Sequence, residues 1–154
     1  MSLNSVAGLT MPRTMKMKGM IGAQVEVCLI DLGATHNFVS TEIVSKMNLL
    51  VTKTGAYGVT MGTGDSVKGE GLCCSVAQHL QGIDIVNDFL PLRLGSSDVI
   101  LGVQWLETLG TTHTNWKTQV MKFNLGQESI TLRGDLSLGR LLVSLKAMMK
   151  TLWH

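Results

Sequence analysis

The sequence has few of the residues that build disulfide-rich, membrane-spanning or strongly charged proteins. Only 3 of its 154 residues are cysteine, and two of these are adjacent, so no disulfide framework is indicated and a reducing compartment fits best. No apolar run approaches the roughly 18 residues that a membrane-spanning helix needs. Charged residues make up 16% of the chain and the formal net charge is +2, too even a balance to indicate nucleic-acid binding. We therefore expect a cytoplasmic protein that binds neither membranes nor nucleic acid.

Hydrophobic residues, by contrast, make up 45% of the chain, which is enough at this length for one domain with a substantial core. The pattern divides the sequence into three parts. Residues 1–13 read as a leader, residues 14–134 as the domain, and residues 135–154 as a C-terminal helix or linker.

Alternating apolar and polar residues predict that the domain is mostly β. Residues 14–30 alternate with a glycine turn between them and predict a β-hairpin. Residues 56–80 predict a second, longer hairpin with a glycine-rich tip. Residues 83–94 predict a further strand, in which Pro91 indicates an edge or a strand end. Residues 116–133 predict a last hairpin.

Three segments instead predict helices. Residues 41–48 form a short amphipathic helix that Ser40 or Thr41 can cap and that Asn48 can end. Residues 98–110 pass from an apolar strand into a short helix that ends at Gly110. From Leu136 onward, apolar residues recur at helical spacing and predict an amphipathic C-terminal helix, either a linker or a face that packs on the domain or on a second copy.

Asp31 is the least expected residue of the first hairpin. It ends an alternating strand that places Val25, Val27 and Leu29 on one face, although aspartate is depleted in strands and a buried carboxylate without partners is costly. In one interpretation Asp31 has left the strand and caps a turn, for which Gly33 supplies a positive φ angle. The order of the surrounding motifs favours another interpretation.

Four stretches, taken in order, resemble the retropepsin-like aspartic proteases, most of all the protease domains of gypsy-type long-terminal-repeat retrotransposons of plants. They are "LIDLGATHNFVS", "VTMGTGDSVKGEGLC", "DVILGVQWLETLG" and the following "W…MKF". Together they span about residues 14–134, and their combination is specific where each alone is weak. The resemblance implies an all-β fold, a retropepsin-like closed barrel with two short helices. The four histidines show no metal-ligand spacing with the three cysteines, so we expect neither a metal nor another cofactor.

The resemblance also implies an endopeptidase that acts as a homodimer on a polypeptide, its own Gag-Pol polyprotein. Hydrolysis by carboxylates needs two of them close together, and such a pair shares one proton. The chain has one motif of this kind, at Asp31, and its other aspartates lack it. An identical subunit must then supply the second carboxylate across a two-fold axis.

The family pattern assigns further roles by position. Leu32, Gly33, Ala34 and Thr35 complete the active-site loop, in which Gly33 permits close approach and Ala34 fills the space behind it. A mobile flap over the peptide has its tip at Gly62, Thr63 and Gly64, although glycine-tipped hairpins are often only turns. Leu101 and Gly102 match the second glycine turn that supports the loop, and Trp105 belongs to the core. His36 lies beside the motif, where it either reaches the substrate cleft or makes local hydrogen bonds.

Leu32 departs from the family pattern, which has Ser or Thr between Asp and Gly. That hydroxyl makes hydrogen bonds to the opposite subunit, and leucine has no hydroxyl. Two interpretations follow: an enzyme that tolerates Leu32 through apolar contact across the axis, or a folded but inactive copy that serves as a dimerisation module. A third reading, nucleic-acid binding, rests only on the mild basic excess.

Overall fold

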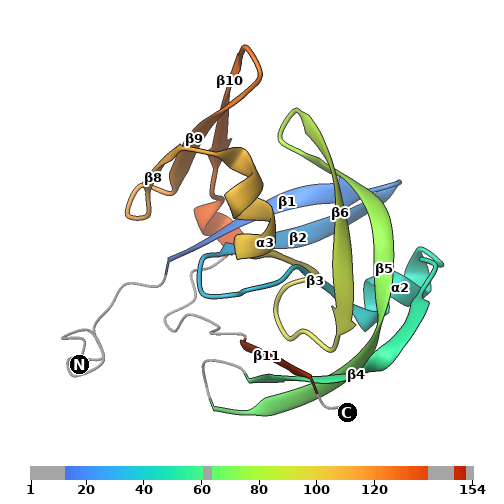
Figure 1. The fold of residues 1–154 in the computed structure, drawn as a ribbon. Helices are drawn as coiled ribbons and strands as arrows, with labels where there is room; N and C mark the ends of the chain where they lie inside the picture. The colour runs from blue at the N-terminus through green and yellow to red at the C-terminus, as the bar shows by residue number, and fades with distance from the viewer. Residues whose placement is uncertain (1–12, 61–63, 139–147, 152–154) are drawn as a thin grey trace.

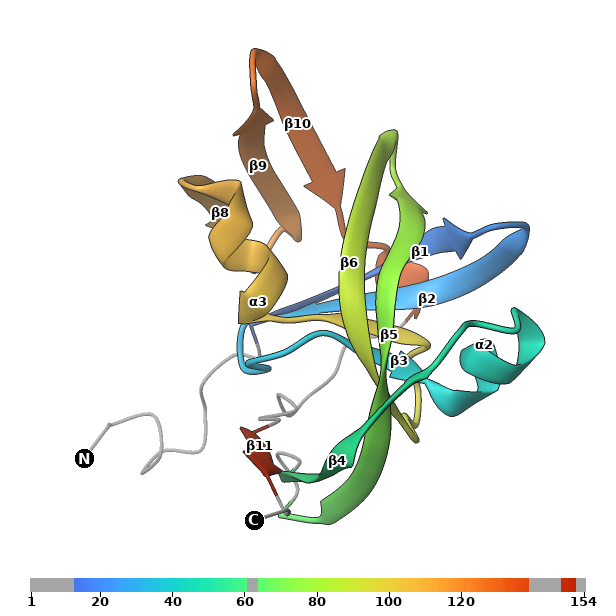
Figure 2. The same ribbon diagram turned by 45° about the vertical axis from the view of Figure 1, so that its right-hand side comes forward.

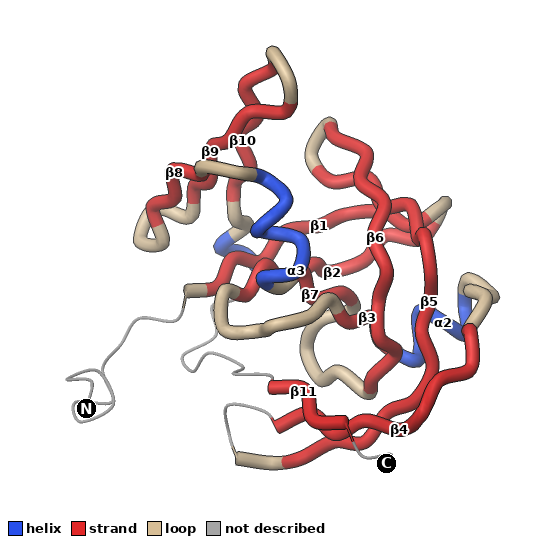
Figure 3. The backbone as a smooth tube through the Cα atoms, in the orientation of Figure 1, coloured by secondary structure: helices blue, strands red, loops and turns tan. Residues whose placement is uncertain are grey.

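The computed structural model describes residues 13–60, 64–138 and 148–151, and most of them lie in strands (Figure 3). One sheet has eight strands in the order β1-β2-β7-β3-β6-β5-β4-β11, and a second has three in the order β10-β9-β8. Figure 1 shows the smaller sheet standing apart from the larger one, with α3 beside it. The strands of the larger sheet are β1 (Thr14–Ile21), β2 (Gln24–Asp31), β3 (Phe38–Ser40), β4 (Thr52–Thr60), β5 (Ser66–Leu80), β6 (Ile83–Leu92), β7 (Val99–Leu101) and β11 (Met148–Thr151). Those of the smaller sheet are β8 (Thr112–Asn115), β9 (Val120–Leu125) and β10 (Glu128–Arg133).

The three predicted hairpins are present. β1 pairs with β2, β4 with β5 and β9 with β10, all antiparallel. Pro91 is paired one residue before the end of β6, so it marks a strand end and not a sheet edge. One further pair, Met20 with His79, joins β1 to β5. This pair links β5, the sixth strand in the order, back to β1, the first.

Two of the predicted helices are also confirmed. α2 (Thr41–Lys46) begins after Ser40, whose hydroxyl accepts a hydrogen bond from the backbone N–H of Ile43 at 3.2 Å. Asn48 follows the helix with a φ of 50°, a conformation that asparagine tolerates better than most residues. α3 (Val103–Leu106) continues as a 3₁₀ turn to Leu109, and Gly110 leaves it with a φ of 70°.

The C-terminal segment differs from the predicted helix. Leu136–Leu138 form a 3₁₀ turn, and Met148–Thr151 form β11, which pairs antiparallel with β4 (Figure 2). The predicted helix is therefore wrong for residues 148–151. Residues 139–147 and 152–154 lie outside the described part, where the prediction is not tested. An edge strand such as β4 offers unpaired backbone groups, and pairing with them can outweigh a helical spacing of apolar side chains. β8 was likewise not predicted from the sequence.

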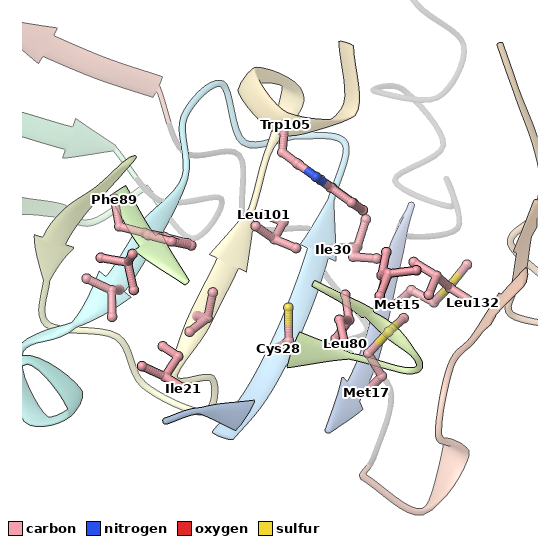
Figure 4. Packing of buried hydrophobic residues seen from close by; sticks show 14 of the residues in the cluster. Met15, Met17, Ile21, Cys28, Ile30, Leu80, Phe89, Leu101, Trp105 and Leu132 are labelled. Atoms are coloured by element: carbon pink, nitrogen blue, oxygen red, sulfur yellow. The ribbon is translucent and has the colours of Figure 1, made fainter. Parts of the chain in front are cut away.

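The main core lies between the strands of the larger sheet, the smaller sheet and α3. Figure 4 shows Cys28, Ile30, Leu80, Leu101 and Trp105 converging from four elements, β2, β5, β7 and α3, with Met15, Met17 and Leu132 beside them. Val25, Val27 and Leu29 share a face as predicted, but Val25 is 53% exposed. The more deeply buried face of β2 is the opposite one, on which Glu26, Cys28 and Ile30 are buried. A second apolar cluster covers only the end of the first face, around Leu29 and Tyr57.

Tyr57 anchors the base of the long β4–β5 hairpin. Its hydroxyl lies 2.9 Å from the carbonyl oxygen of Pro91 and 3.0 Å from that of Gly71, and can donate to either. Burial raises the pKa of Tyr57 to about 12, so the hydroxyl keeps its proton at any physiological pH.

Across the described residues, the structure contains no helix of the length and apolarity that crossing a bilayer requires.

Candidate active site

Asp31 is the last residue of β2, and its side chain is completely buried within the chain. β2 lies between β1 and β7, with Thr14 opposite Asp31 and Leu101 opposite Ile30. The chain turns sharply after it: the N–H of Gly33 donates to Asp31 Oδ1 at 2.8 Å and the N–H of Ala34 to the carbonyl oxygen of Asp31 at 3.1 Å. The carboxyl group does cap a turn, but Gly33 does not supply the positive φ angle that this interpretation expected.

The loop after Asp31 presents some of its side chains outward and buries others. Leu32 is 38% exposed and Thr35 is exposed, whereas Ala34 is fully buried in the second apolar cluster. The N–H of Leu32 donates to the carbonyl oxygen of Arg13 at 3.1 Å. An apolar side chain therefore stands on the surface directly after the buried acid.

A second glycine turn, between β7 and α3, supports this loop from behind. The N–H of Val103 donates to the carbonyl oxygen of Ala34 at 2.8 Å, and that of Gln104 to the carbonyl oxygen of Thr35 at 3.1 Å. A Cβ atom on Gly102 would lie 2.5 Å from the carbonyl oxygens of both Ala34 and His36. Only glycine permits this approach, so the predicted support by Leu101 and Gly102 has a direct physical basis.

Asn37 and Gln104 complete the support, and neither was predicted from the sequence. Asn37 is buried; its Oδ1 accepts from the N–H of Gly102 at 3.0 Å and its Nδ2 donates to the carbonyl oxygen of Asp88 at 3.4 Å. Its own N–H donates to Gln104 Oε1 at 3.2 Å. An asparagine directly before the apolar run "FVS" was the available signal, because a buried amide needs several partners.

Replacing Gly102 by alanine is expected to lower the free energy of unfolding by about 1–3 kcal/mol, the usual cost of overpacking a dense site. The new methyl group would meet two carbonyl oxygens that cannot move without breaking the support of the loop. Gly95→Ala is the matched control, because nothing lies within 4 Å of a Cβ atom there. Urea unfolding measures both. Equal stability of the two variants would show that the close approach does not constrain the loop.

The remaining predicted residues are placed only in part. Of the three predicted tip residues only Gly64 is described, with a φ of 93°, while Gly62 and Thr63 lie outside the described residues, so the flap stays a prediction. His36 makes the local contact that was one of its two alternatives, Nδ1 to Thr35 Oγ1 at 2.8 Å. No group of three or more His, Cys, Asp or Glu side chains placed to hold a metal ion occurs in the described ranges.

A shallow hollow on the β8–β9–β10 sheet lies away from this loop. The charged residues that line it are Lys122 and Arg133, and its polar lining residues include His113. No carboxyl group lines it. Hydrolysis by carboxylates therefore has no basis there. Asp31 remains the candidate for chemistry.

Comparison with known proteins shows the family to which the chain belongs. The model of a family described as "Retroviral aspartyl protease" matches residues 10–128. Among solved structures, the retroviral protease-like domain of Ddi1 from Leishmania major is similar with a TM-score of 0.58 and 13% sequence identity, over 82% of this chain and 95% of that chain. At this identity the likeness shows the fold alone. A search of curated proteins found no match.

Proposed function

Because the chain belongs to the retroviral aspartyl protease family, we propose that it is an aspartic endopeptidase in which two identical subunits each contribute Asp31. The observation that carries this proposal is the position of Asp31, at the end of a buried strand and in a glycine loop supported by a second glycine turn. The chain contains one such loop, so a second copy must complete the site. The closed barrel expected from the sequence belongs to the same proposal, and the pairing of Met20 with His79 supports it.

The proposed chemistry follows from the proximity of two like charges. Two carboxyl groups in hydrogen-bond contact cannot both ionise readily, so the pair holds one proton and titrates as a unit. The ionised group takes a proton from water, and the protonated group polarises the scissile carbonyl. Asp31 needs a fixed orientation for this, which the hydrogen bond from Gly33 to Oδ1 provides. A flap at residues 62–64 would exclude bulk water from the bound peptide.

The substrate belongs to the same proposal. The motif order of the sequence, with "THNF" after the active-site glycine, supports a gypsy-type retrotransposon as the source. The substrate would then be the Gag-Pol polyprotein, processed in the cytoplasm or inside virus-like particles. Each chain would act as enzyme only after it met a second copy, which delays cleavage until the polyproteins are concentrated.

Cleavage of a peptide from a polyprotein junction tests the proposal. We expect hydrolysis at acidic to near-neutral pH, inhibition by pepstatin, and a rate that rises with the square of protein concentration below the dimer dissociation constant. Mass spectrometry of the products identifies the bond that is cut. A pepstatin-insensitive rate that is linear in protein concentration would contradict a two-chain site.

Two observations favour a second candidate function, a non-catalytic dimerisation module on the same fold. Leu32 cannot make the hydroxyl hydrogen bonds of the family, and the carboxyl group of Asp31 is closed off from solvent within one chain. Sedimentation that shows a dimer, together with no cleavage even in Leu32→Ser, would support the module over the enzyme.

A further inference from the structure

A second acid of β2, Glu26, is buried in the main core although no mechanism requires it there. It is 1% exposed, and Gln78 of β5, which contacts it, is 2% exposed. Gln78 Nε2 donates to Glu26 Oε1 at 2.7 Å. The other carboxyl oxygen, Glu26 Oε2, and the amide oxygen Gln78 Oε1 have no hydrogen-bond partner among the residues that the structure describes. Two buried acceptors without a donor are costly, and a proton on Oε2 would supply the missing donor.

The backbone leaves space for this pair. Gly19 of β1 is opposite Glu26, and a Cβ atom there would collide with Glu26 Oε1. The carbonyl oxygen of His79 is the next neighbour of that position, and Met20 pairs with His79 directly. The acid and the amide therefore lie where β1, β2 and β5 meet, at the contact that links the first and sixth strands of the order.

The charged groups around Glu26 disfavour its ionised form. Asp98, just before β7, adds a second negative charge, and the neutral thiol of Cys28 is next on the same face of β2. Lys16 and Lys18 of β1 are opposite Leu29 and Val27, so they project from the other face. His79 of β5 is exposed and contacts Asp84. Burial, opposed by the hydrogen bond from Gln78 and assisted by Asp98, raises the pKa of Glu26 from 4.5 to about 7.

We propose that Glu26 takes up a proton from solvent when the protein folds and holds it in a cyclic acid–amide pair with Gln78, which makes the junction of β1, β2 and β5 sensitive to pH. Below neutral pH the proton on Oε2 is donated to Gln78 Oε1, and both orphaned acceptors are satisfied. Above neutral pH the proton leaves, and a carboxylate remains in the core beside Asp98. This inference does not depend on the protein being a protease.

The direction of the effect follows from proton linkage. The folded state binds this proton more tightly than the unfolded state, so the stabilisation is complete below pH 4.5 and is lost as pH rises through about 7. Ionisation of Glu26 also places its charge beside Asp98, whose hydrogen bond to β2 lies near the candidate site. Asp98 Oδ2 accepts from the N–H of Val27 at 2.8 Å, which ties the segment before β7 to the strand that ends in Asp31.

Urea unfolding of the whole chain between pH 4.5 and 8.5 tests the proposal, with Glu26→Gln as the diagnostic variant. Glutamine keeps the shape and both hydrogen bonds without an ionisable proton. We expect the folded-to-unfolded ratio of the parent to fall, relative to that of Glu26→Gln, by roughly two orders of magnitude across this range. Glu128→Gln, a substitution of an exposed acid, should follow the parent. Parallel profiles of parent and Glu26→Gln would overturn the proposal.

If Glu26→Gln does not fold, a direct titration of the parent protein tests the proposal. The ¹³C side-chain carboxyl resonances of the folded parent report each of its five glutamates separately. We expect one of them to titrate at about pH 7. Titration of all five near the ordinary value of about 4.3 would overturn the proposal.

Discussion

Asp31→Asn is expected to reduce peptide cleavage by at least about 10²–10⁴-fold, the usual contribution of a positioned acid or base. Asparagine can still accept the hydrogen bond from Gly33, so the loop should keep its shape. What it loses is the ability to exchange a proton with water or with the scissile carbonyl. Initial rates on the junction peptide at acidic pH measure the effect, and thermal melting confirms that the variant is folded.

Asp84→Asn is the matched control for this experiment, because the Asp84 side chain is 87% exposed and interacts with the exposed His79. The same chemical change there should leave the rate near that of the parent. A rate in Asp31→Asn equal to that of the control would remove Asp31 from the chemistry and contradict the proposed pair of Asp31 carboxyl groups.

Leu32→Ser is expected to tighten the dimer and to raise turnover. The two serine hydroxyls of the dimer can restore up to two hydrogen bonds between the subunits, each with a net value of about 0.5–1.5 kcal/mol, so the dissociation constant should fall by about 5- to 150-fold. Leu32 is already 38% exposed in the single chain, so its removal leaves no cavity in the core. Sedimentation equilibrium measures the affinity, and the cleavage assay measures turnover.

Leu50→Ser makes the same chemical change at a side chain that is 85% exposed. It should leave the dissociation constant unchanged, because nothing assigns Leu50 to the proposed two-fold axis. If Leu32→Ser bound no more tightly than the parent, the missing hydroxyl would not weaken the dimer. A weaker dimer would show instead that apolar contact between the two leucines holds the subunits together.

Two separate groups are expected to make this protein sensitive to acidic pH, and a different property reports on each of them. In the two proposals, the Asp31 pair sets the rate of cleavage, whereas the proton on Glu26 contributes to the free energy of unfolding. Glu26→Gln should therefore remove the loss of stability that Glu26 causes as pH rises from 4.5 to about 7, and leave the need for Asp31 intact. Measuring both properties on the same variants separates a failure of the active site from a failure of the fold.

Local signals sufficed for much of the fold. The three hairpins, the Ser40 cap and the Gly110 stop each depend on residues within a few positions of one another, and the structure contains all of them. The placement of Asp31 at a strand end was also readable, because an acid after alternating apolar residues is rare.

Features that depend on distant parts of the chain were not readable from the sequence. The buried face of β2 is set by which cluster covers it, so Glu26 lies in the core although its apolar neighbour Val25 is exposed. β11 forms because β4 offers an unpaired edge, and Asn37 finds its partners 65 residues away at Gly102. Alternation and helical spacing carry no information about such contacts.

A crystal structure of the purified chain would test the two-chain site most directly. We expect copies related by a two-fold axis, with Asp31 carboxyl oxygens of the two chains about 2.5–3.0 Å apart, the distance of a shared proton. Asp31 is buried within one chain, so this arrangement requires that its carboxyl group open onto the surface where the copies meet. Copies whose Asp31 side chains stay buried and remote from one another would contradict the proposed dyad.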